Sequence, residues 1–208
     1  MRLFISFFLL LGSFMAFSQS EKYTEAMQKN LSQLDAAKTT QDFQTVANSF
    51  ARIGETEKTQ WLPYYYAGLA LSRAGWTDPN LDKDANADRI KAFCEKAMAI
   101  EKNSEIYSLL NMAATQEMMV DPQTRWQTYG QEASANLDTA MKLNPDNPRL
   151  YYLKGMSIFN TPVAFGGGKE KAKPLFEKAV ALYKDEKPKT LYPNWGGPQA
   201  EDMLAKCQ

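Results

Sequence analysis

The chain has 208 residues, of which 44% are hydrophobic and 23% are charged, a balance that fits one or two globular domains and argues against disorder. Its 24 basic and 24 acidic side chains cancel, so nothing favours nucleic acid or an anionic membrane as the main partner. The chain contains no histidine, which removes the commonest general base and the commonest metal ligand. We therefore expect no catalysis, no catalytic residue, no metal site and no cofactor.

Residues 1–18 have the features of a secretory signal peptide. Arg2 supplies a positive start, an apolar run of about 15 residues follows, and Ala16-Phe17-Ser18 offers small residues before a cleavage site. The run is shorter than the roughly 20 residues that a membrane-spanning helix needs. The sequence predicts a mature domain at residues 19–208, exported across the inner membrane to a bacterial periplasm, with no membrane span.

Apolar residues recur at three- and four-residue steps through the mature chain, which predicts an all-α fold. We expect Gly54 to end the second helix, Gly75 to end the third, and residues 75–84 to form a loop before a helix that begins at Asp88. The expected architecture is four antiparallel helix hairpins at about 22–54, 61–101, 104–143 and 149–184, followed by a terminal helix at 198–206.

A small-residue pattern recurs in the second helix of each hairpin, and a recurring pattern indicates stacked units rather than one closed core. Its four copies are Val46-x3-Phe50-x2-Ile53, Ile90-x3-Cys94-x2-Ala97, Ala133-x3-Leu137-x2-Ala140 and Ala172-x3-Phe176-x2-Ala179. Small residues opposite large ones let helices interlock, so we expect the two phenylalanines to fill the gaps between hairpins.

These units resemble the tetratricopeptide repeat (TPR), a pair of antiparallel helices. The fourth unit matches best, with Tyr151, Gly155 and Ile158 in its first helix and Ala172, Phe176 and Ala179 in its second; Gly68 and Pro145 fill repeat positions in the second and third units. The resemblance implies a right-handed superhelix whose first helices line a concave groove. The units are longer than the family's repeat of about 34 residues, and the extra length falls at the turn inside each hairpin.

Two of these turns resemble ligand-binding loops. Residues 82–88 place acids or amides at alternate positions as a calcium loop does, but Ala87 replaces the glycine and Phe93 the glutamate that such a loop needs. We expect a solvated acidic loop in which Asp84 or Asp88 caps the next helix. Residues 165–169 place glycines and a lysine before a helix, but the serine or threonine and the preceding strand of a phosphate-binding loop are missing, which favours a flexible turn.

The aromatic residues suggest a binding surface. By the repeat register, Tyr65 and Tyr152 fall on the face that lines the groove, with Arg73 and Arg149 on or beside it. Aromatic rings and arginines are favoured interface anchors. We expect these four residues to be partly exposed and to form a partner-binding groove, although long neighbouring helices could instead cover the rings.

The resulting interpretation is an exported scaffold, expected to be a monomer, that binds a protein or peptide in the cell envelope. The alternative is a small-molecule or glycan-binding module that uses the aromatic groove. Two cysteines in an exported protein could pair. However, Cys94 and Cys207 belong to units that are far apart in the expected stack, so we predict no disulfide between them and a buried Cys94.

Overall fold

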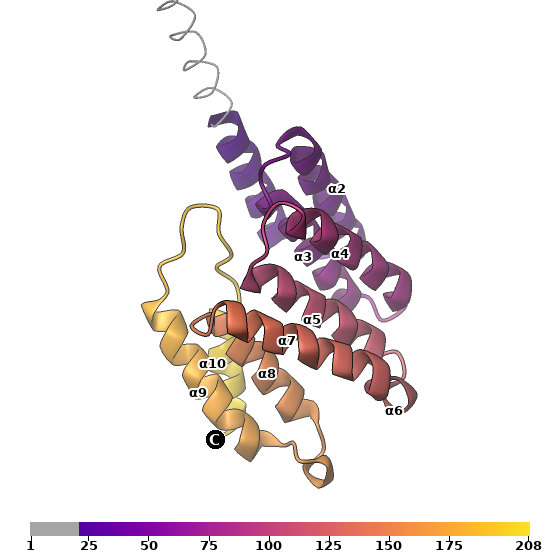
Figure 1. Ribbon diagram of the computed structural model, residues 1–208, viewed down its shortest axis with the longest axis vertical. Helices are drawn as coiled ribbons and strands as arrows, with labels where there is room; N and C mark the ends of the chain where they lie inside the picture. Colours follow the sequence, from indigo (N-terminus) through magenta and orange to yellow (C-terminus); the bar gives the residue numbers. More distant parts are fainter. Residues whose placement is uncertain (1–20) are drawn as a thin grey trace, which may run out of the picture.

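The computed structural model describes residues 21–208, so the predicted signal peptide lies outside the described residues. Within this range every regular element is a helix, which confirms the all-α prediction (Figure 1). A first helical segment covers residues 21–36. It is followed by α2 (Thr40–Thr56), α3 (Leu62–Thr77), α4 (Lys83–Met98), α5 (Ser104–Met118), α6 (Pro122–Arg125), a π-helical turn (Trp126–Gly130), α7 (Gln131–Leu143), α8 (Pro148–Asn160), a 3₁₀ turn (Val163–Phe165), α9 (Lys169–Asp185) and α10 (Gly197–Lys206).

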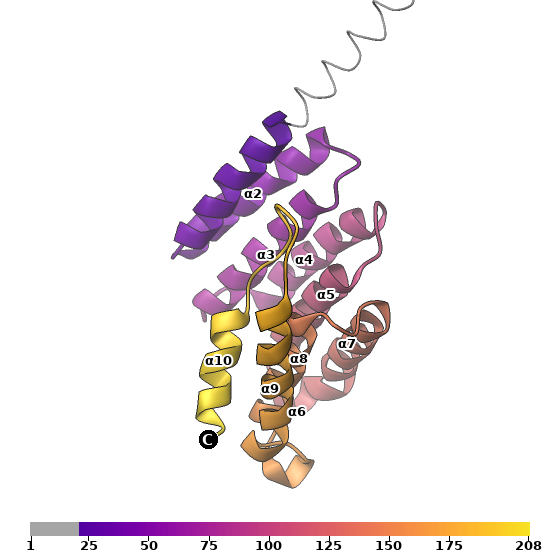
Figure 2. The ribbon, with the colours of Figure 1, turned by 90° about the vertical axis from the view of Figure 1, so that its left-hand side faces the viewer.

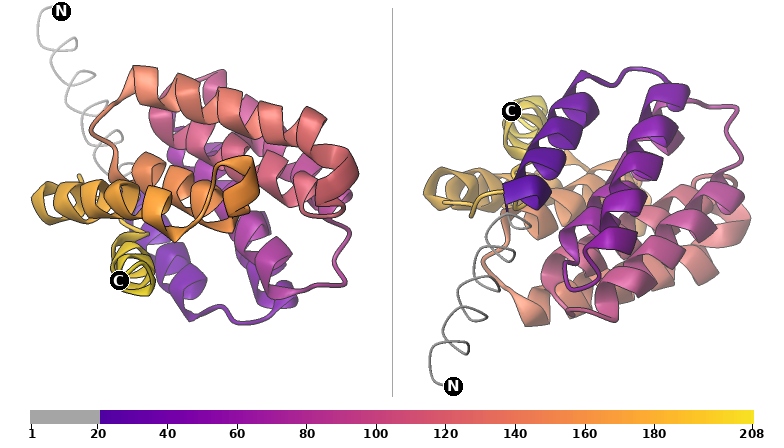
Figure 3. Two further views of the ribbon diagram at one scale, coloured as in Figure 1. Left: turned by 90° about the horizontal axis from the view of Figure 1, so that it is seen from below. Right: turned by 90° about the horizontal axis from the view of Figure 1, so that it is seen from above.

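Helices that are neighbours along the chain are also neighbours in space. α2 packs on α3, α3 on α4, α4 on α5, α5 on α7, and α8 on α9. Figure 1 shows these pairs following one another from the N-terminal to the C-terminal end, and Figure 3 shows α10 beside α9 at the C-terminal end. The arrangement is solenoid-like, because each pair is stabilised mainly by the pairs next to it. No helix within residues 21–208 is long and apolar enough to cross a bilayer.

The apolar interior is divided rather than continuous. The largest cluster joins α2, α3, α4 and α5, while smaller clusters lie between α7 and α8 and among α8, α9 and α10. Nearly every residue of α3 from Leu62 to Gly75 is buried, so this helix is enclosed on all sides. The large members of the recurring pattern, Phe50, Cys94, Leu137 and Phe176, are all buried.

Glycines allow close approach between helices at two positions that the pattern singled out. A Cβ atom on Gly155 would lie 2.6 Å from Cε1 of Phe176, so the Phe176 ring of α9 packs directly against the backbone of α8. A Cβ atom on Gly68 would lie 2.7 Å from Cδ2 of Leu109. Each glycine thus leaves room for a large side chain from another helix.

Three helix boundaries differ from prediction. α2 continues past Gly54, because that glycine lies beneath the ring of Tyr64 rather than in a turn. α3 likewise continues past Gly75, which packs against Gln116. α4 begins at Lys83 instead of Asp88, because the side chain of Asp82 caps it by accepting a hydrogen bond from the backbone N–H of Ala85 at 3.0 Å.

The early start of α4 corrects the interpretation of residues 82–88 as a solvated loop. Neither Asp84 nor Asp88 caps the helix. Asp84 instead forms an ion pair with Arg125 at 2.6 Å, and Asn86 is buried, donating a hydrogen bond to the carbonyl of Leu71 at 3.0 Å. The polar side chains of this segment therefore join α4 to its neighbours.

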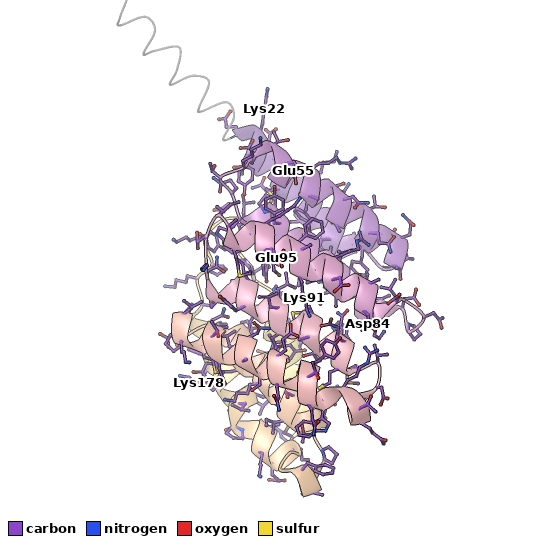
Figure 4. All side chains as sticks on the ribbon, turned by 45° about the vertical axis from the view of Figure 1, so that its right-hand side comes forward. Lys22, Glu55, Asp84, Lys91, Glu95 and Lys178 are labelled. Atoms are coloured by element: carbon purple, nitrogen blue, oxygen red, sulfur yellow. The ribbon has the colours of Figure 1, made fainter. Side chains whose placement is uncertain are left out.

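Charged pairs cross several helix boundaries on the outer face. Lys96 pairs with Glu55 of α2 at 2.6 Å, and Lys91 pairs with Glu117 and Glu132 at 2.7 and 3.0 Å. Figure 4 shows Glu55, Lys91 and Asp84 following this face from α2 along α4. Both cysteines are buried free thiols: Cys94 lies in the large cluster and Cys207 in the C-terminal one.

The connection between α9 and α10, residues 186–196, is here called the strap. It rises from the C-terminal helices and lies along α3 (Figure 2). The carbonyl of Leu191 accepts a hydrogen bond from the hydroxyl of Tyr66 at 2.8 Å, and the indole of Trp195 donates to the hydroxyl of Tyr65 at 2.7 Å. The strap thereby connects residues that are 125 and 130 positions apart in the sequence.

Candidate functional site

A buried polar cluster lies where α3, α5, α8 and the strap meet. Its central pair is Arg149 of α8 and Glu105 of α5, with Nε of the arginine 2.9 and 3.0 Å from the two carboxylate oxygens. On its other side, the guanidinium donates to both carboxylate oxygens of Glu186, at the start of the strap. We call Tyr65, Glu105, Arg149, Glu186 and Trp195 the arginine cluster.

Helix starts position the central pair. Asn103 caps α5 and Asn147 caps α8, so that Glu105 and Arg149 each occupy the second residue of a helix. A carboxylate is favoured near a helix N-terminus and a cation is not. Two carboxylates offset this cost for Arg149. The amide of Asn147 also donates to Glu105 at 2.8 Å and to the hydroxyl of Ser104 at 3.0 Å, which fixes the two helix starts together.

Aromatic groups surround the guanidinium. Its carbon atom lies 6.0 Å from the ring centroid of Tyr183 and 5.9 Å from that of Trp195, within the range of cation–π attraction. The carbonyl of Trp195 accepts a hydrogen bond from the hydroxyl of Tyr183 at 3.0 Å. The strap is therefore held against the arginine cluster by a ring, a carbonyl and a carboxylate.

Burial and charge act in opposite directions on these groups. Burial raises the pKa of Glu105, whereas Arg149 and Asn147 oppose that shift. Burial alone would lower the pKa of Arg149, but the carboxylates of Glu105 and Glu186 outweigh it and raise the pKa, so the side chain is a permanent cation. Burial also raises the pKa of Tyr65 well above that of a free tyrosine.

A cavity of about 360 Å³ opens beside the arginine cluster. One wall is the start of α5 and the residues that precede it, and the opposite wall is the strap. Its lining includes two aromatic side chains, three lysines and three glutamates in addition to Arg149: Trp61, Tyr192, Lys102, Lys187, Lys189, Glu101, Glu105 and Glu186. The volume lies within the roughly 300–1,000 Å³ of small-molecule sites.

The aromatic wall of the cavity is ordered by ring packing. Trp61 makes edge-to-face contacts with Tyr192 of the strap and with Tyr65 of α3, in both cases at 5.7 Å between ring centroids. The ammonium group of Lys189 lies 5.5 Å from the centroid of the Tyr192 ring. Aromatic residues beside Arg149 and three lysines are groups that can bind a flat molecule that carries acidic groups.

The four predicted groove residues do not form one exposed surface. Tyr65 is 0% exposed and Arg149 is 3% exposed, so the expectation of partial exposure is wrong for both. The reason is the strap, whose Trp195 and Glu186 cover them. Arg73 is half-buried and pairs with Asp35 at 3.7 Å.

Tyr152 is half-buried against Phe176, within the C-terminal apolar cluster. The structure thus brings Tyr65 and Arg149 into one cluster and leaves Arg73 and Tyr152 outside it.

Sequence reasoning missed the strap. Two aromatic residues, Tyr192 and Trp195, stand in a stretch rich in proline and glycine that has no helical period. Large aromatic rings in such a stretch indicate that the segment packs on a folded surface, because exposed apolar side chains in a connection are unfavourable unless another surface covers them. Glu105 and Glu186 carry no comparable signal, since charged residues near helix ends are common.

Fold and cavity together define a solenoid-like helical protein with an open pocket lined by aromatic and charged residues. No protein-family model and no curated protein matches the chain. Among solved structures it is similar to the HusA haemophore from Porphyromonas gingivalis, with a TM-score of 0.79, 35% sequence identity, and coverage of 89% of this chain and 92% of that one. At this identity and coverage, the chain belongs to the same protein family as HusA.

Proposed function

We propose that this protein is an exported carrier that binds a flat, carboxylate-bearing small molecule, with haem as the first candidate. The observation that carries the proposal is the cavity beside the arginine cluster, whose lining combines two aromatic residues, Arg149 and three lysines with three glutamates. The relationship to a haemophore over 92% of that chain's length supports haem as the ligand to test first. This reading corresponds to the small-molecule alternative of the sequence analysis and replaces the protein scaffold as the leading hypothesis.

The residues present can bind haem only without an imidazole ligand to the iron. The chain contains no histidine, so recognition falls to the tetrapyrrole face, the two carboxylates or a ligand other than imidazole. Trp61 and Tyr192 offer aromatic contacts, Lys102, Lys187 and Lys189 offer cations, and all five residues line the cavity. Haem would supply the iron, whereas these side chains bind and orient the macrocycle.

A titration with ferric haem and with iron-free protoporphyrin IX tests the proposal. We expect both to bind, with similar dissociation constants if the ring and carboxylates are what is recognised. The double substitution Lys187→Glu/Lys189→Glu should weaken binding about tenfold, because each lost exposed ion pair contributes roughly 0.2–1 kcal/mol and charge reversal adds repulsion.

Lys178→Glu is the matched control. Lys178 lies over the ring of Tyr151 at 5.9 Å, as Lys189 lies over Tyr192, but it lies on α9 outside the cavity lining. This variant should bind haem as the unmodified protein does. Saturable binding that is equally weakened by both sets of substitutions would contradict the cavity as the site, and no binding at all would contradict the function.

A protein-binding role remains a second candidate because of three aromatic side chains at the ends of helix hairpins. Trp76, Trp126 and Phe165 are 51%, 53% and 82% exposed, and exposed apolar residues commonly mark interaction surfaces. Capture of one specific envelope protein, lost on Trp76→Ala/Trp126→Ala but not on Lys187→Glu/Lys189→Glu, would support this role.

A further inference from the structure

Arg149 is shared between a fixed carboxylate and one on the strap. Glu105 lies in a regular helix and accepts further hydrogen bonds from Asn147 at 2.8 Å and from the hydroxyl of Tyr65 at 3.4 Å. Glu186 lies just after the last residue of α9, where the backbone leaves the helix in an extended conformation. The two carboxylates thus differ in how firmly the fold holds them.

The pair of Arg149 and Glu186 also faces the cavity, whose lining includes both side chains. The terminal nitrogens of Arg149 are directed to Glu186, whereas its Nε is directed to Glu105. Arginine binds carboxylates through such paired N–H groups whether the carboxylate belongs to the protein or to a ligand. A carboxylate that entered the cavity would meet a guanidinium already arranged to receive one.

The remaining strap contacts begin at residue 191 and include packing on the large apolar cluster and burial of Pro193 and Gly196. They involve Leu191, Tyr192 and Trp195, while residues 187–190 are exposed. Leu191 has a φ of 68°, in the left-handed region that a leucine rarely adopts. The closed position of the strap therefore depends on these contacts and on the Glu186 pair, rather than on regular secondary structure.

The closed cavity is small for a macrocycle. Its volume of about 360 Å³ lies near the lower end of the roughly 300–1,000 Å³ of small-molecule sites. The strap forms one entire wall, so movement of that wall is the direct way to enlarge the cavity. Movement would also expose Tyr65 and Arg149.

We propose that Glu186 occupies the position on Arg149 that a carboxylate of the ligand takes when the ligand binds. The ligand carboxylate displaces Glu186 from Arg149, and this displacement opens the strap. This inference rests on the proposed function and adds two features to it. Arg149 is the receptor for one carboxylate of the ligand, and the strap is the element that moves. The closed strap gives the terminal nitrogens of Arg149 a carboxylate when no ligand is present, because Glu105 bonds only to Nε.

The decisive variant is Glu186→Gln, with Asp185→Asn as its matched control. Both remove one carboxylate at the end of α9, but Asp185 is exposed and lies outside the arginine cluster. Binding of ferric haem and of haem dimethyl ester, which lacks free carboxylates, is measured for each protein. Removing the internal competitor should strengthen haem binding about tenfold, because a charge-assisted hydrogen bond corresponds to a factor of roughly ten or more. The ester also requires an open strap, so its binding should be strengthened as well. It should nevertheless bind about tenfold more weakly than haem in both proteins, because it offers no carboxylate to Arg149.

Glu186→Asp is the second variant, in case the glutamine form does not fold. It keeps the charge but shortens its reach, so haem binding should be strengthened by a smaller factor. Hydrogen exchange provides a second readout: in the unmodified protein, backbone amides of residues 186–196 should exchange faster when haem is bound, while those of α3 and α5 should not.

The outcomes separate this inference from the proposed function. Haem binding that is the same in the Glu186→Gln and Asp185→Asn proteins, or an ester that binds as tightly as haem to both, overturns the displacement of Glu186 by a carboxylate and leaves haem binding intact. Slower exchange of the strap with haem bound also overturns it, since the strap would then close over the ligand. If no variant binds haem, the proposed function fails and this inference fails with it.

Discussion

Arg149 and Glu105 form a buried ion pair that joins the start of α8 to the start of α5, with Nε 2.9 and 3.0 Å from the two carboxylate oxygens. The residues lie 44 positions apart, and their side chains are 4% and 11% exposed. Because the apolar cluster between α7 and α8 is small, this pair is a principal link between the N-terminal and C-terminal halves of the described chain.

Removing one partner of this pair should be strongly destabilising. We expect Arg149→Ala to lower the free energy of unfolding by about 3–5 kcal/mol, because it leaves the carboxylates of Glu105 and Glu186 without their cation. The double substitution Arg149→Met/Glu105→Gln should cost less, since no buried charge remains unpaired inside α5. Urea denaturation measures both; a loss under about 1 kcal/mol for the single substitution would contradict a structural role.

The burial of Tyr65 changes what its substitution should do. A groove residue would affect binding more than stability, but Tyr65 is fully buried, as is Phe176. We expect Tyr65→Ala and Phe176→Ala each to cost about 3–5 kcal/mol in the free energy of unfolding. Tyr65→Phe should cost about 1–3 kcal/mol, because the indole N–H of Trp195 loses its acceptor.

Trp126, which is 53% exposed, provides the control for these stability measurements. Trp126→Ala should change the free energy of unfolding by about 0.5 kcal/mol or less. A Tyr65→Ala protein as stable as the Trp126→Ala protein would indicate that the strap does not cover α3 in solution.

The contact between Gly155 and Phe176 should not tolerate a methyl group. A Cβ atom at position 155 would lie 2.6 Å from the ring, so Gly155→Ala is expected to cost about 1–3 kcal/mol. Adding Phe176→Leu should remove part of the clash, so the two substitutions together should cost less than the sum of the two alone. Gly197→Ala is the control, because its Cβ would lie 3.7 Å from Tyr183, an ordinary contact. Thermal or urea unfolding of the four proteins is the measurement.

Alkaline pH should destabilise the fold through its buried tyrosines. Burial is the first cause that raises the pKa of Tyr23 to about 12, and it also raises the pKa of Tyr65, Tyr66 and Tyr183. These groups lose their protons in the unfolded chain near pH 10, before they do so in the folded one. Their stabilising contribution is therefore fully present below about pH 10 and is lost as the pH rises through the folded-state values.

Urea denaturation between pH 9 and pH 12 checks this expectation, with tyrosinate absorbance followed in parallel. The free energy of unfolding should fall steadily above about pH 10. Tyrosine ionisation that is complete near pH 10 while the fold is still intact would show that these side chains are exposed to solvent.

Local sequence patterns were sufficient for the helices and for much of the core. Helical periodicity predicts the elements that the structure shows, and the recurring pattern predicts the buried positions of Phe50, Cys94, Leu137 and Phe176. Such patterns succeed because they reflect contacts between neighbouring segments. The resemblance to tetratricopeptide repeats and the signal peptide remain predictions.

The same reasoning misplaced helix ends at glycines. Gly54 and Gly75 lie inside α2 and α3, since each makes room for a side chain from another helix, Tyr64 in one case and Gln116 in the other. The sequence alone does not distinguish a glycine that ends a helix from a glycine that makes room for a side chain of another helix. Only the packing partner distinguishes the two.

The sequence by itself determined an all-helical chain of stacked pairs, because period and spacing along the chain encode which faces of adjacent helices pack together. Tertiary structure alone decided the candidate site. Register predicted Tyr65 and Arg149, together with Arg73 and Tyr152, as exposed groove residues. Tyr65 and Arg149 are instead covered by Trp195 and Glu186, which lie 130 and 37 residues away from them in sequence. Contacts over such separations produce no periodic pattern in the sequence. The strap is an irregular segment, and its specific hydrogen bonds and ring contacts position it across the helices.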